Sequence, residues 1–263
     1  MEAPLTATTA GPRILIVVPT LGTRLEFLER CLKSISSQEA RADIVIVGPE
    51  TPALHEMAAR FNAEFLKDPG SLTGAINLGA SSASPAHEFV NWLGDDDLLA
   101  PGGLRAVSQA LDVNPSAVVA YGACRYVDED DREIWLNRAG PWARRVLKWG
   151  PDLIPQPGML IRVSAWRAVN GVDESFRFAF DLDLLLRLQR IGSLVDVDDV
   201  VSSFRWHADS LTVGDRTTNL RESEDAKRRA LGPVARKLSW LWERPVRGAT
   251  RLAAAEVQRR SRK

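Results

Sequence analysis

Three consecutive aspartates, Asp95, Asp96 and Asp97, are the residues of this sequence whose type and spacing most favour chemistry. They directly follow an apolar run at residues 89–93 that is typical of a buried strand. Carboxylates this close repel one another and raise one another's pKa unless a cation or hydrogen bonds hold them ionised. Hard divalent cations commonly use one or two carboxylates together with substrate phosphates. The cluster therefore predicts a cation site; a solvated acidic turn that starts a helix is the alternative.

A fourth carboxylate, Asp181, begins a segment with helical spacing at residues 181–191. A positioned aspartate can remove a proton as a general base. It can equally cap a helix near the positive end of the helix dipole. Asp183 is expected to pair with Arg187, four positions further along the same helix. Both interpretations of Asp181 stay open on the residues alone.

The segments that must position these carboxylates alternate between strand and helix patterns. Strands are predicted at residues 14–18, 44–47, 64–66 and 89–93. The helices predicted between them cover residues 25–35, 52–62 and 73–82. Such alternation is typical of an α/β fold with a mainly parallel central sheet flanked by helices, which binds ligands beyond the carboxyl ends of its strands. The loops expected to border the site are residues 19–24, 48–51 and 94–101.

The pattern becomes less regular after a predicted helix at residues 102–114. Further strands are predicted at residues 117–121, 125–127, 159–162 and 200–206. Residues 137–157 contain four prolines, together with Trp142 and Trp149. Segments of this kind are often lids or binding loops, so we expect a long loop over the site.

The composition is that of a globular chain, with 45% hydrophobic and 26% charged residues among 263. It excludes disordered and fibrous classes. No apolar run approaches the roughly 20 residues of a membrane-spanning helix, and the first residues do not resemble a secretory signal, so a cytoplasmic protein is expected. Two cysteines exclude a disulfide framework. Phosphate-binding P-loop, dinucleotide-binding glycine and zinc-type patterns are missing, and nucleic acid is not an expected partner.

The net charge of zero conceals a basic C-terminal segment. Residues 214–263 carry 14 Lys and Arg against six Asp and Glu, a balance of +8. The segment is predicted to be helical and contains Leu238, Trp240, Leu241 and Trp242. Basic residues with interfacial aromatics favour contact with an anionic membrane surface, here the inner face, or with a partner enzyme. The alternative is a helical pair packed on the rest of the chain.

Several segments, in their order and spacing, resemble glycosyltransferase family 2, whose members have the GT-A fold. The opening strand reads Ile-Val-Val-Pro-Thr at residues 16–20, and Gly-Ala-Ile-Asn-Leu-Gly follows at 74–79. After the three aspartates come Gly-Val-Asp-Glu-Ser-Phe at 171–176, Asp-Leu-Asp-Leu-Leu-Leu-Arg at 181–187 and Phe-Arg-Trp-His at 204–207. The resemblance covers about residues 13–212. It implies a flexible N-terminus at 1–12, a catalytic domain at 13–213 and a basic helical extension at 214–263.

The resemblance implies an inverting transfer of a sugar from a nucleotide-diphosphate sugar to the hydroxyl of a glycan or lipid-linked acceptor, in bacterial glycan or glycolipid biosynthesis. Asp181 takes the place of the general base, although Phe180 replaces a common Glu. Mn²⁺ or Mg²⁺ is the implied cofactor, and Asp96 is its foremost ligand. Gly94 stands where the first Asp of the usual D-x-D motif is expected. The implied metal ligands are Asp95, Asp96, Asp97 and His207.

The family pattern also implies contacts to the substrates. The donor would be held by Pro19, Thr20, Leu21, Glu50, Asp68, Asn77, Asp95 and Arg205. Among these, Glu50 stands in for an acidic residue that family members carry after the second strand. The acceptor would be contacted by Gln156 and Trp142. The nucleotide base is open among UDP, dTDP and GDP.

Two other functions fit parts of the sequence. A non-catalytic nucleotide-sugar-binding or scaffold protein would keep the fold and lose turnover through Gly94, Gly48 and Phe180. A sugar-phosphate nucleotidyltransferase is suggested by Leu-Gly-Thr-Arg-Leu at residues 21–25. That motif lacks the two preceding glycines and the nearby lysine that such an enzyme needs.

Overall fold

The computed structural model describes residues 13–206, 216–243 and 245–248. Within them, a sheet of nine strands forms the centre of the molecule, in the order β3-β2-β1-β4-β8-β6-β9-β5, with β7 beside β6. The strands are β1 (Arg13–Pro19), β2 (Ala42–Gly48), β3 (Glu64–Lys67), β4 (His87–Trp92), β5 (Leu98–Leu99), β6 (Ala117–Val127), β7 (Glu133–Asn137), β8 (Met159–Arg162) and β9 (Ser193–Arg205).

The half of the sheet around β1 is parallel, as predicted. β2 and β4 flank β1, and β3 lies beside β2, all in the same direction. The other half is mixed, because β8 runs antiparallel to both β4 and β6 while β9 is parallel to β6. The order reverses between β1 and β4, which is the switch point where open α/β sheets bind ligands.

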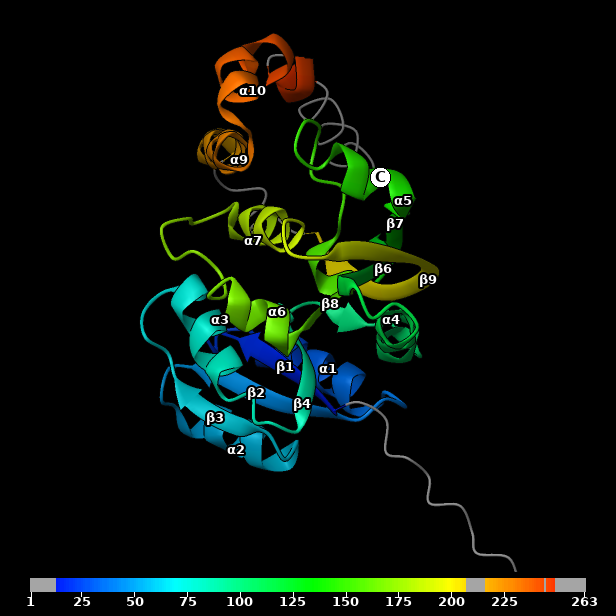
Figure 1. Ribbon diagram of the computed structural model, residues 1–263. Helices are drawn as coiled ribbons and strands as arrows, with labels where there is room; N and C mark the ends of the chain where they lie inside the picture. The colour runs from blue at the N-terminus through cyan, green and yellow to red at the C-terminus, as the bar shows by residue number, and fades with distance from the viewer. Residues whose placement is uncertain (1–12, 207–215, 244, 249–263) are drawn as a thin grey trace, which may run out of the picture.

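Helices lie on both faces of this sheet (Figure 1). The helices of the described residues are α1 (Leu25–Ser36), α2 (Pro52–Arg60), α3 (Leu72–Ser81), α4 (Gly103–Asp112), α5 (Gly140–Val146), the 3-10 turn η1 (Gln156–Gly158), α6 (Val163–Ala168), α7 (Phe180–Leu188), α9 (Arg216–Ala230) and α10 (Pro233–Leu238), of which α9 packs on α7. Alternate residues of β1 serve two cores: Leu15 and Val17 pack with α3, α6 and α7, and Ile14, Ile16 and Val18 with α1, α2 and α4. This is the period of two that a strand buried on both faces requires.

Helix α3 lies unusually close to β1. A Cβ atom added at Gly79 would be 2.3 Å from Cγ1 of Val17, so a side chain there would force the helix away from the sheet. The first turn of α3 is fixed by Ser71, whose hydroxyl accepts a hydrogen bond from the Gly74 amide. The close packing therefore sets the position of the loop before α3, which borders the cavity described below.

The predicted long loop at residues 137–157 is only partly irregular. It starts at the end of β7, and α5 and η1 lie within it. Ala143 of α5 and Leu147, the residue after this helix, are buried and anchor α5 to the core. The two predicted strands at 117–121 and 125–127 are one continuous strand, β6, because its pairing with β9 continues through register shifts between residues 117 and 124.

The C-terminal segment packs on the body, beside α7, at the end of the molecule opposite α2 (Figure 1). Ala226 of α9 is buried, and the ring of Trp242 contacts Trp149 at 4.9 Å between centroids. These contacts correspond to the alternative of a packed helical pair. The described helices include none with the length and apolarity needed to cross a bilayer. The predicted N-terminal segment 1–12 and the domain boundary at 213 lie outside the described residues.

Candidate active site

A cavity of about 710 Å³ opens at the carboxyl ends of β1 and β4, in the size range of small-molecule sites. Its walls combine the loop after β1, the acidic segment after β4, the start of α7 and the C-terminal helices. Nine of the residues that the sequence assigns to metal binding, substrate binding or catalysis line this cavity: Pro19, Thr20, Leu21, Asp68, Asp95, Asp96, Asp97, Gln156 and Asp181.

Asp95 is held from the neighbouring strand. The Thr20 hydroxyl donates a hydrogen bond of 2.5 Å to Oδ2 of Asp95, and it accepts one of 2.9 Å from the Gly22 amide. Arg24 lies 3.3 Å from Oδ1 of Asp95 and 3.0 Å from Oδ2 of Asp96. Two carboxylates thus converge on one guanidinium, which balances part of their charge.

Asp97 faces the interior of the molecule. Its Oδ1 accepts a 3.0 Å hydrogen bond from the Arg205 amide, and the side chain is almost completely buried. Burial, and after it the negative charge of Asp96, raises the pKa of Asp97 well above its ordinary value. Of the three aspartates, Asp96 is the most open to the cavity.

Arg205 does not line the cavity, contrary to its expected place beside the donor phosphate. Its guanidinium donates to the backbone oxygens of Asp96, Asp128 and Glu129 and pairs with Asp131 at 2.6 Å. The ring of Phe27 lies 4.6 Å from the guanidinium carbon. Arg205 therefore ties the end of β9 and the turn after β6 to the acidic segment.

A divalent cation suits the donor set near Arg24. Carboxylate oxygens are the ligands that Mg²⁺ and Mn²⁺ prefer, and Mg²⁺ often takes one or two carboxylates and completes its shell with water and substrate phosphate. Asp95 and Asp96 already converge on one positive charge. No group of three or more His, Cys, Asp or Glu side chains is arranged around a common metal position in the described part of the chain. The predicted ligand His207 lies outside that part.

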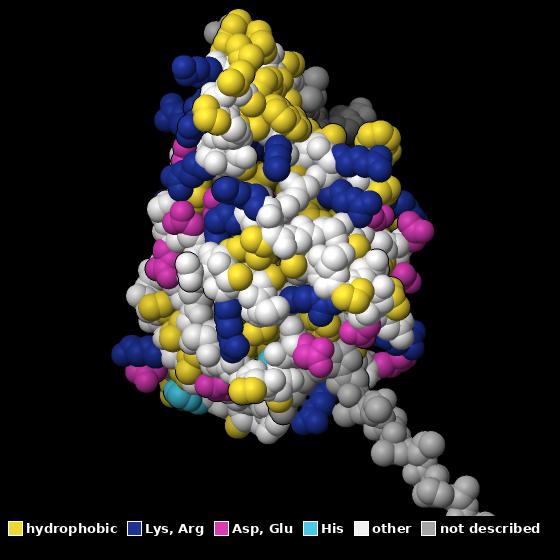
Figure 2. Space-filling view, viewed as in Figure 1, with side chains coloured by type: hydrophobic (Ala, Val, Ile, Leu, Met, Phe, Trp, Pro, Cys, Tyr) yellow, Lys and Arg dark blue, Asp and Glu magenta, His cyan; other side chains and the backbone are white. Residues whose placement is uncertain are grey.

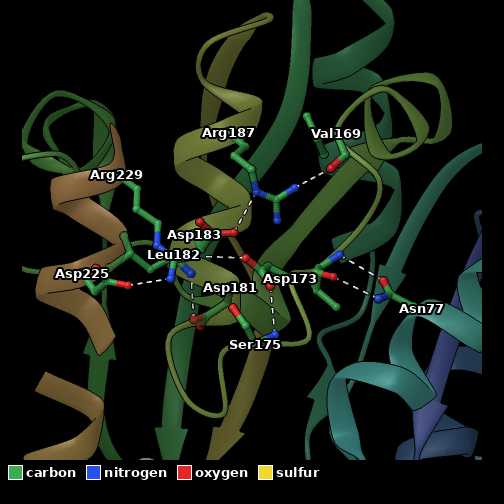
Figure 3. Close-up of polar contacts among 11 residues, drawn as sticks. Asn77, Val169, Asp173, Ser175, Asp181, Leu182, Asp183, Arg187, Asp225 and Arg229 are labelled. Atoms are coloured by element: carbon green, nitrogen blue, oxygen red, sulfur yellow. Dashed lines mark hydrogen bonds and ion pairs between the residues drawn. The ribbon is translucent and has the colours of Figure 1, made fainter. Parts of the chain in front are cut away.

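Asp181 lies in the first turn of α7 and lines the same cavity as the loop after β1. Its Oδ1 accepts a 2.8 Å hydrogen bond from the Leu182 amide. Burial raises the pKa of Asp181 to about 6, against the lowering effect of that bond. Asp183 is buried and pairs with Arg187 at 2.7 Å, as expected (Figure 3). A carboxylate with a raised pKa in a cleft is well suited to accept a proton.

A second carboxyl group, Asp152, lines the cavity near Asp181 and was not singled out in the sequence. Its side chain is accessible from the cavity, and Oδ1 accepts a 3.1 Å hydrogen bond from the Ile154 amide. Enclosure by the cavity walls, and second the negative charge of Asp181, raises the pKa of Asp152 to about 7. Only its place in the proline-rich segment before η1 pointed toward it in the sequence.

Three more predicted contacts lie outside the cavity lining. Glu50 forms a 3.3 Å ion pair with Lys67, and both side chains are exposed. The Asn77 amide is used within the fold, donating to the Val172 carbonyl and to Glu174 (Figure 3 shows its place beside Asp173). Trp142 is 66% exposed, on α5. By contrast, Gln156 reaches the cavity and donates to the carbonyl of Trp92 at 2.7 Å.

The fold and site define an α/β protein with an acidic cavity at the switch point of its sheet. The model of the family "Glycosyl transferase family 2" matches residues 15–169, and the chain belongs to this family. O-antigen biosynthesis protein RfbC of Myxococcus xanthus is 28% identical over 199 residues, which are 70% of this chain and 15% of that protein. The chain thus spans a small part of that relative's length.

Solved structures share the GT-A fold with this chain. TarS of S. aureus (residues 1–349, with UDP-GlcNAc) aligns with a TM-score of 0.63 at 12% identity, over 86% of this chain and 70% of that chain. Mannosyltransferase PcManGT from Pyrobaculum calidifontis, with GDP-Man and Mn²⁺, gives a TM-score of 0.63 at 16% identity, over 94% and 76%. The expected family and fold are confirmed.

Proposed function

We propose that this chain is an inverting glycosyltransferase that moves a sugar from a nucleotide-diphosphate sugar to an acceptor hydroxyl. The observation that carries the proposal is that Asp181 and the pair Asp95–Asp96 line one cavity at the switch point of the sheet. The family match and the nucleotide sugars named with the two similar structures support the same substrate class. Participation in glycan biosynthesis is supported by the similarity to RfbC.

The donor side of the site is the loop after β1. Pro19, Thr20 and Leu21 line the cavity and would contact the nucleoside, and Asp68 lines it from the loop before α3. Asp95 and Asp96 would hold the divalent cation, with Asp97 as a supporting carboxylate. When bound, the cation would balance the charge that develops on the leaving nucleoside diphosphate. Arg24 adds a further positive charge at the same place.

Asp181 would act as the general base. In an inverting transfer, the acceptor oxygen attacks the anomeric carbon while its proton passes to the base, and the bond from that carbon to the diphosphate oxygen breaks. The negative charge thus moves from the Asp181 carboxylate to the nucleoside diphosphate. A pKa of about 6 leaves Asp181 ionised near neutral pH and strong enough to accept the proton.

The decisive experiment offers the purified chain a panel of nucleotide sugars with Mn²⁺ or Mg²⁺ and analyses the released nucleotide. Release of nucleoside diphosphate, together with an inverted anomeric product, is expected. Pyrophosphate formed from a nucleoside triphosphate and a sugar phosphate would instead identify a nucleotidyltransferase. Donor binding without any turnover would identify the non-catalytic binding protein and reject the transferase.

A peripheral contact with an anionic membrane is a further part of the proposal. Exposed Val234, Leu238, Trp240 and Leu241 gather around α10 beside Arg236 and Lys237, and Figure 2 shows hydrophobic and basic side chains at this end of the molecule. Basic residues near an anionic surface contribute about 1 kcal/mol each. Co-sedimentation with phosphatidylserine vesicles should be stronger for the full chain than for Trp240→Ala/Leu241→Ala. Equal, negligible sedimentation of both would reject membrane contact in favour of a partner enzyme or packing alone.

A further inference from the structure

The C-terminal helices supply a wall of the cavity that the family model does not include. The match ends at residue 169, whereas Ser223, Glu224, Lys227, Trp242 and Arg247 line the same cavity as Asp181. Helix α9 packs directly on α7, the helix that begins with Asp181 (Figure 1). Part of the cavity that contains the candidate base is therefore lined by residues that lie 40 or more positions further along the chain.

One part of this wall is polar. Nζ of Lys227 donates a 2.6 Å hydrogen bond to the Gly150 carbonyl, at the start of the segment that carries Asp152. Lys227 and Asp152 attract each other electrostatically, and Asp152 lines the same cavity as Asp181. Asp152 is accessible from the cavity. A carboxyl group and an ammonium group in the same cavity as the candidate base thus offer an acceptor and donors of hydrogen bonds.

The adjacent part is aromatic. The rings of Trp149 and Trp242 meet edge to face, with centroids 4.9 Å apart and an interplanar angle of 68°. Both line the cavity, and Trp149 remains 42% exposed. A tryptophan held at its edge by a second ring offers a rigid apolar face to a ligand at low cost in side-chain entropy.

The charges of the wall are paired internally. Glu224 forms bidentate bonds of 2.6 and 2.8 Å with Nη2 of Arg247, and Glu243 pairs with Arg228 at 2.6 Å. Together with the attraction between Lys227 and Asp152, this leaves no large excess of either sign among these residues. Such a surface favours a neutral ligand with many hydroxyl groups and an apolar face over a strongly charged one.

We infer that Trp149, Trp242, Asp152 and Lys227 form the subsite for a neutral pyranose ring of the acceptor, adjacent to the hydroxyl that Asp181 would deprotonate. This inference deepens the proposed function and rests on it. The apolar face of the ring would lie on Trp149, while Asp152 and Lys227 bond to ring hydroxyls. The C-terminal helices, together with residues 149–152, then determine acceptor specificity, while the loop after β1 and the acidic segment after β4 bind the donor.

The test measures binding and transfer separately. Methyl pyranosides of the gluco, galacto, manno and rhamno series are titrated by saturation-transfer NMR into the full chain saturated with nucleoside diphosphate. Trp149→Ala and Lys227→Met should weaken pyranoside binding at least about tenfold, the loss of one aromatic or charged contact. Release of nucleoside diphosphate by hydrolysis of the donor with water is measured in parallel on the unmodified chain. Trp149→Phe, which keeps an aromatic face, should recover most of the binding.

Trp135→Ala and Lys33→Met are the matched controls, since neither residue lines the cavity. Both should bind pyranosides as the unmodified chain does. Unchanged pyranoside binding in Trp149→Ala and Lys227→Met, or no binding of any pyranoside by the unmodified chain, would overturn the subsite. Selective loss of pyranoside binding without any donor turnover in the unmodified chain would support the subsite and reject the proposed transferase, so the two failures are distinguishable.

Discussion

Thr20, at the end of β1, donates a 2.5 Å hydrogen bond to Asp95, at the end of β4. The bond joins the two strands between which the sheet order reverses, and it fixes the orientation of a carboxylate that would hold the cation. Hydrogen bonds to charged groups contribute about 1.5–3 kcal/mol. Loss of the bond between Thr20 and Asp95 should therefore lower the affinity for the donor measurably.

Thr20→Val should weaken metal-dependent donor binding by about tenfold or more, because Oδ2 of Asp95 loses the hydrogen bond from the Thr20 hydroxyl. Isothermal titration with a nucleotide sugar and Mn²⁺ measures the change. Thr20→Ser retains the hydroxyl and is the control. Equal affinities of the Val and Ser variants would show that the bond does not orient the site.

Asp96→Ala should abolish most transfer while leaving the thermal unfolding temperature within about 2 °C, because Asp96 is the aspartate most open to the cavity. Chelation of divalent ions should produce the same loss in the unmodified chain. Asp112→Ala, on the exposed face of α4, should have normal turnover. Full turnover in excess chelator would reject the metal-dependent mechanism.

Asp181→Asn should lower kcat about 10²- to 10⁴-fold with donor binding preserved, as expected for loss of a positioned base. In the unmodified chain, kcat/KM should rise with pH and level off above about 6, because the ionised form of Asp181 is the active one. Asp183→Asn disrupts the pair with Arg187 and should reduce stability more than chemistry. A weaker donor affinity at unchanged kcat in Asp181→Asn would assign Asp181 to binding.

Glu222 of α9 should support the start of α7. Its carboxylate accepts hydrogen bonds of 2.7–3.1 Å from the amides of Arg177, Phe178 and Ala179. Glu222→Ala should cost about 1–3 kcal/mol, a fall of several degrees in unfolding temperature, and shift the acid limb of the pH profile because Asp181 is repositioned. Glu222→Gln, which keeps a side-chain oxygen as acceptor, should show smaller changes in both the unfolding temperature and the pH profile. Asp225→Ala, which removes an exposed pair with Arg229, should change neither property appreciably.

Asp152→Asn should stabilise the protein at alkaline pH. Because the folded-state pKa of Asp152 is raised from 3.8 to about 7, its contribution is fully present below pH 3.8 and is lost as the pH rises through 7. The variant removes that loss, so its unfolding temperature should exceed that of the unmodified chain at about pH 8 and approach it near pH 4. Calorimetry at the two pH values tests the sign. A deficit at alkaline pH would mean that the ionised carboxylate is stabilising.

Sequence patterns predicted the parts of the site that follow from the order of elements. Strand–helix alternation brings the ends of β1 and β4 together, and Thr20 and the acidic cluster accordingly line one cavity. Asp181 lies in the first turn of α7, as its position at the start of the helical pattern predicted.

Other contacts depend on how distant segments fold back, which local patterns do not encode. Lys227 and Glu222 reach the site only because α9 returns to α7. Arg205 was expected at a phosphate, but its guanidinium is satisfied by the turn after β6, a contact across more than 70 residues. Glu50, expected beside the donor, forms an ion pair with Lys67 at the end of β3.

The two cysteine thiols can be used to measure local unfolding in the two halves of the sheet. Cys31, on α1 directly behind the acidic segment, has its Sγ 3.4 Å from the Gly94 carbonyl oxygen, while Cys124 lies in β6 in the other half of the sheet. Both are fully buried, and burial raises the pKa of each, so neither reacts as a thiolate in the closed molecule. The alkylation rate of each cysteine therefore measures how often its half of the molecule unfolds locally, and slower labelling of Cys31 on addition of nucleotide sugar would report occupancy of the site without any assay of turnover.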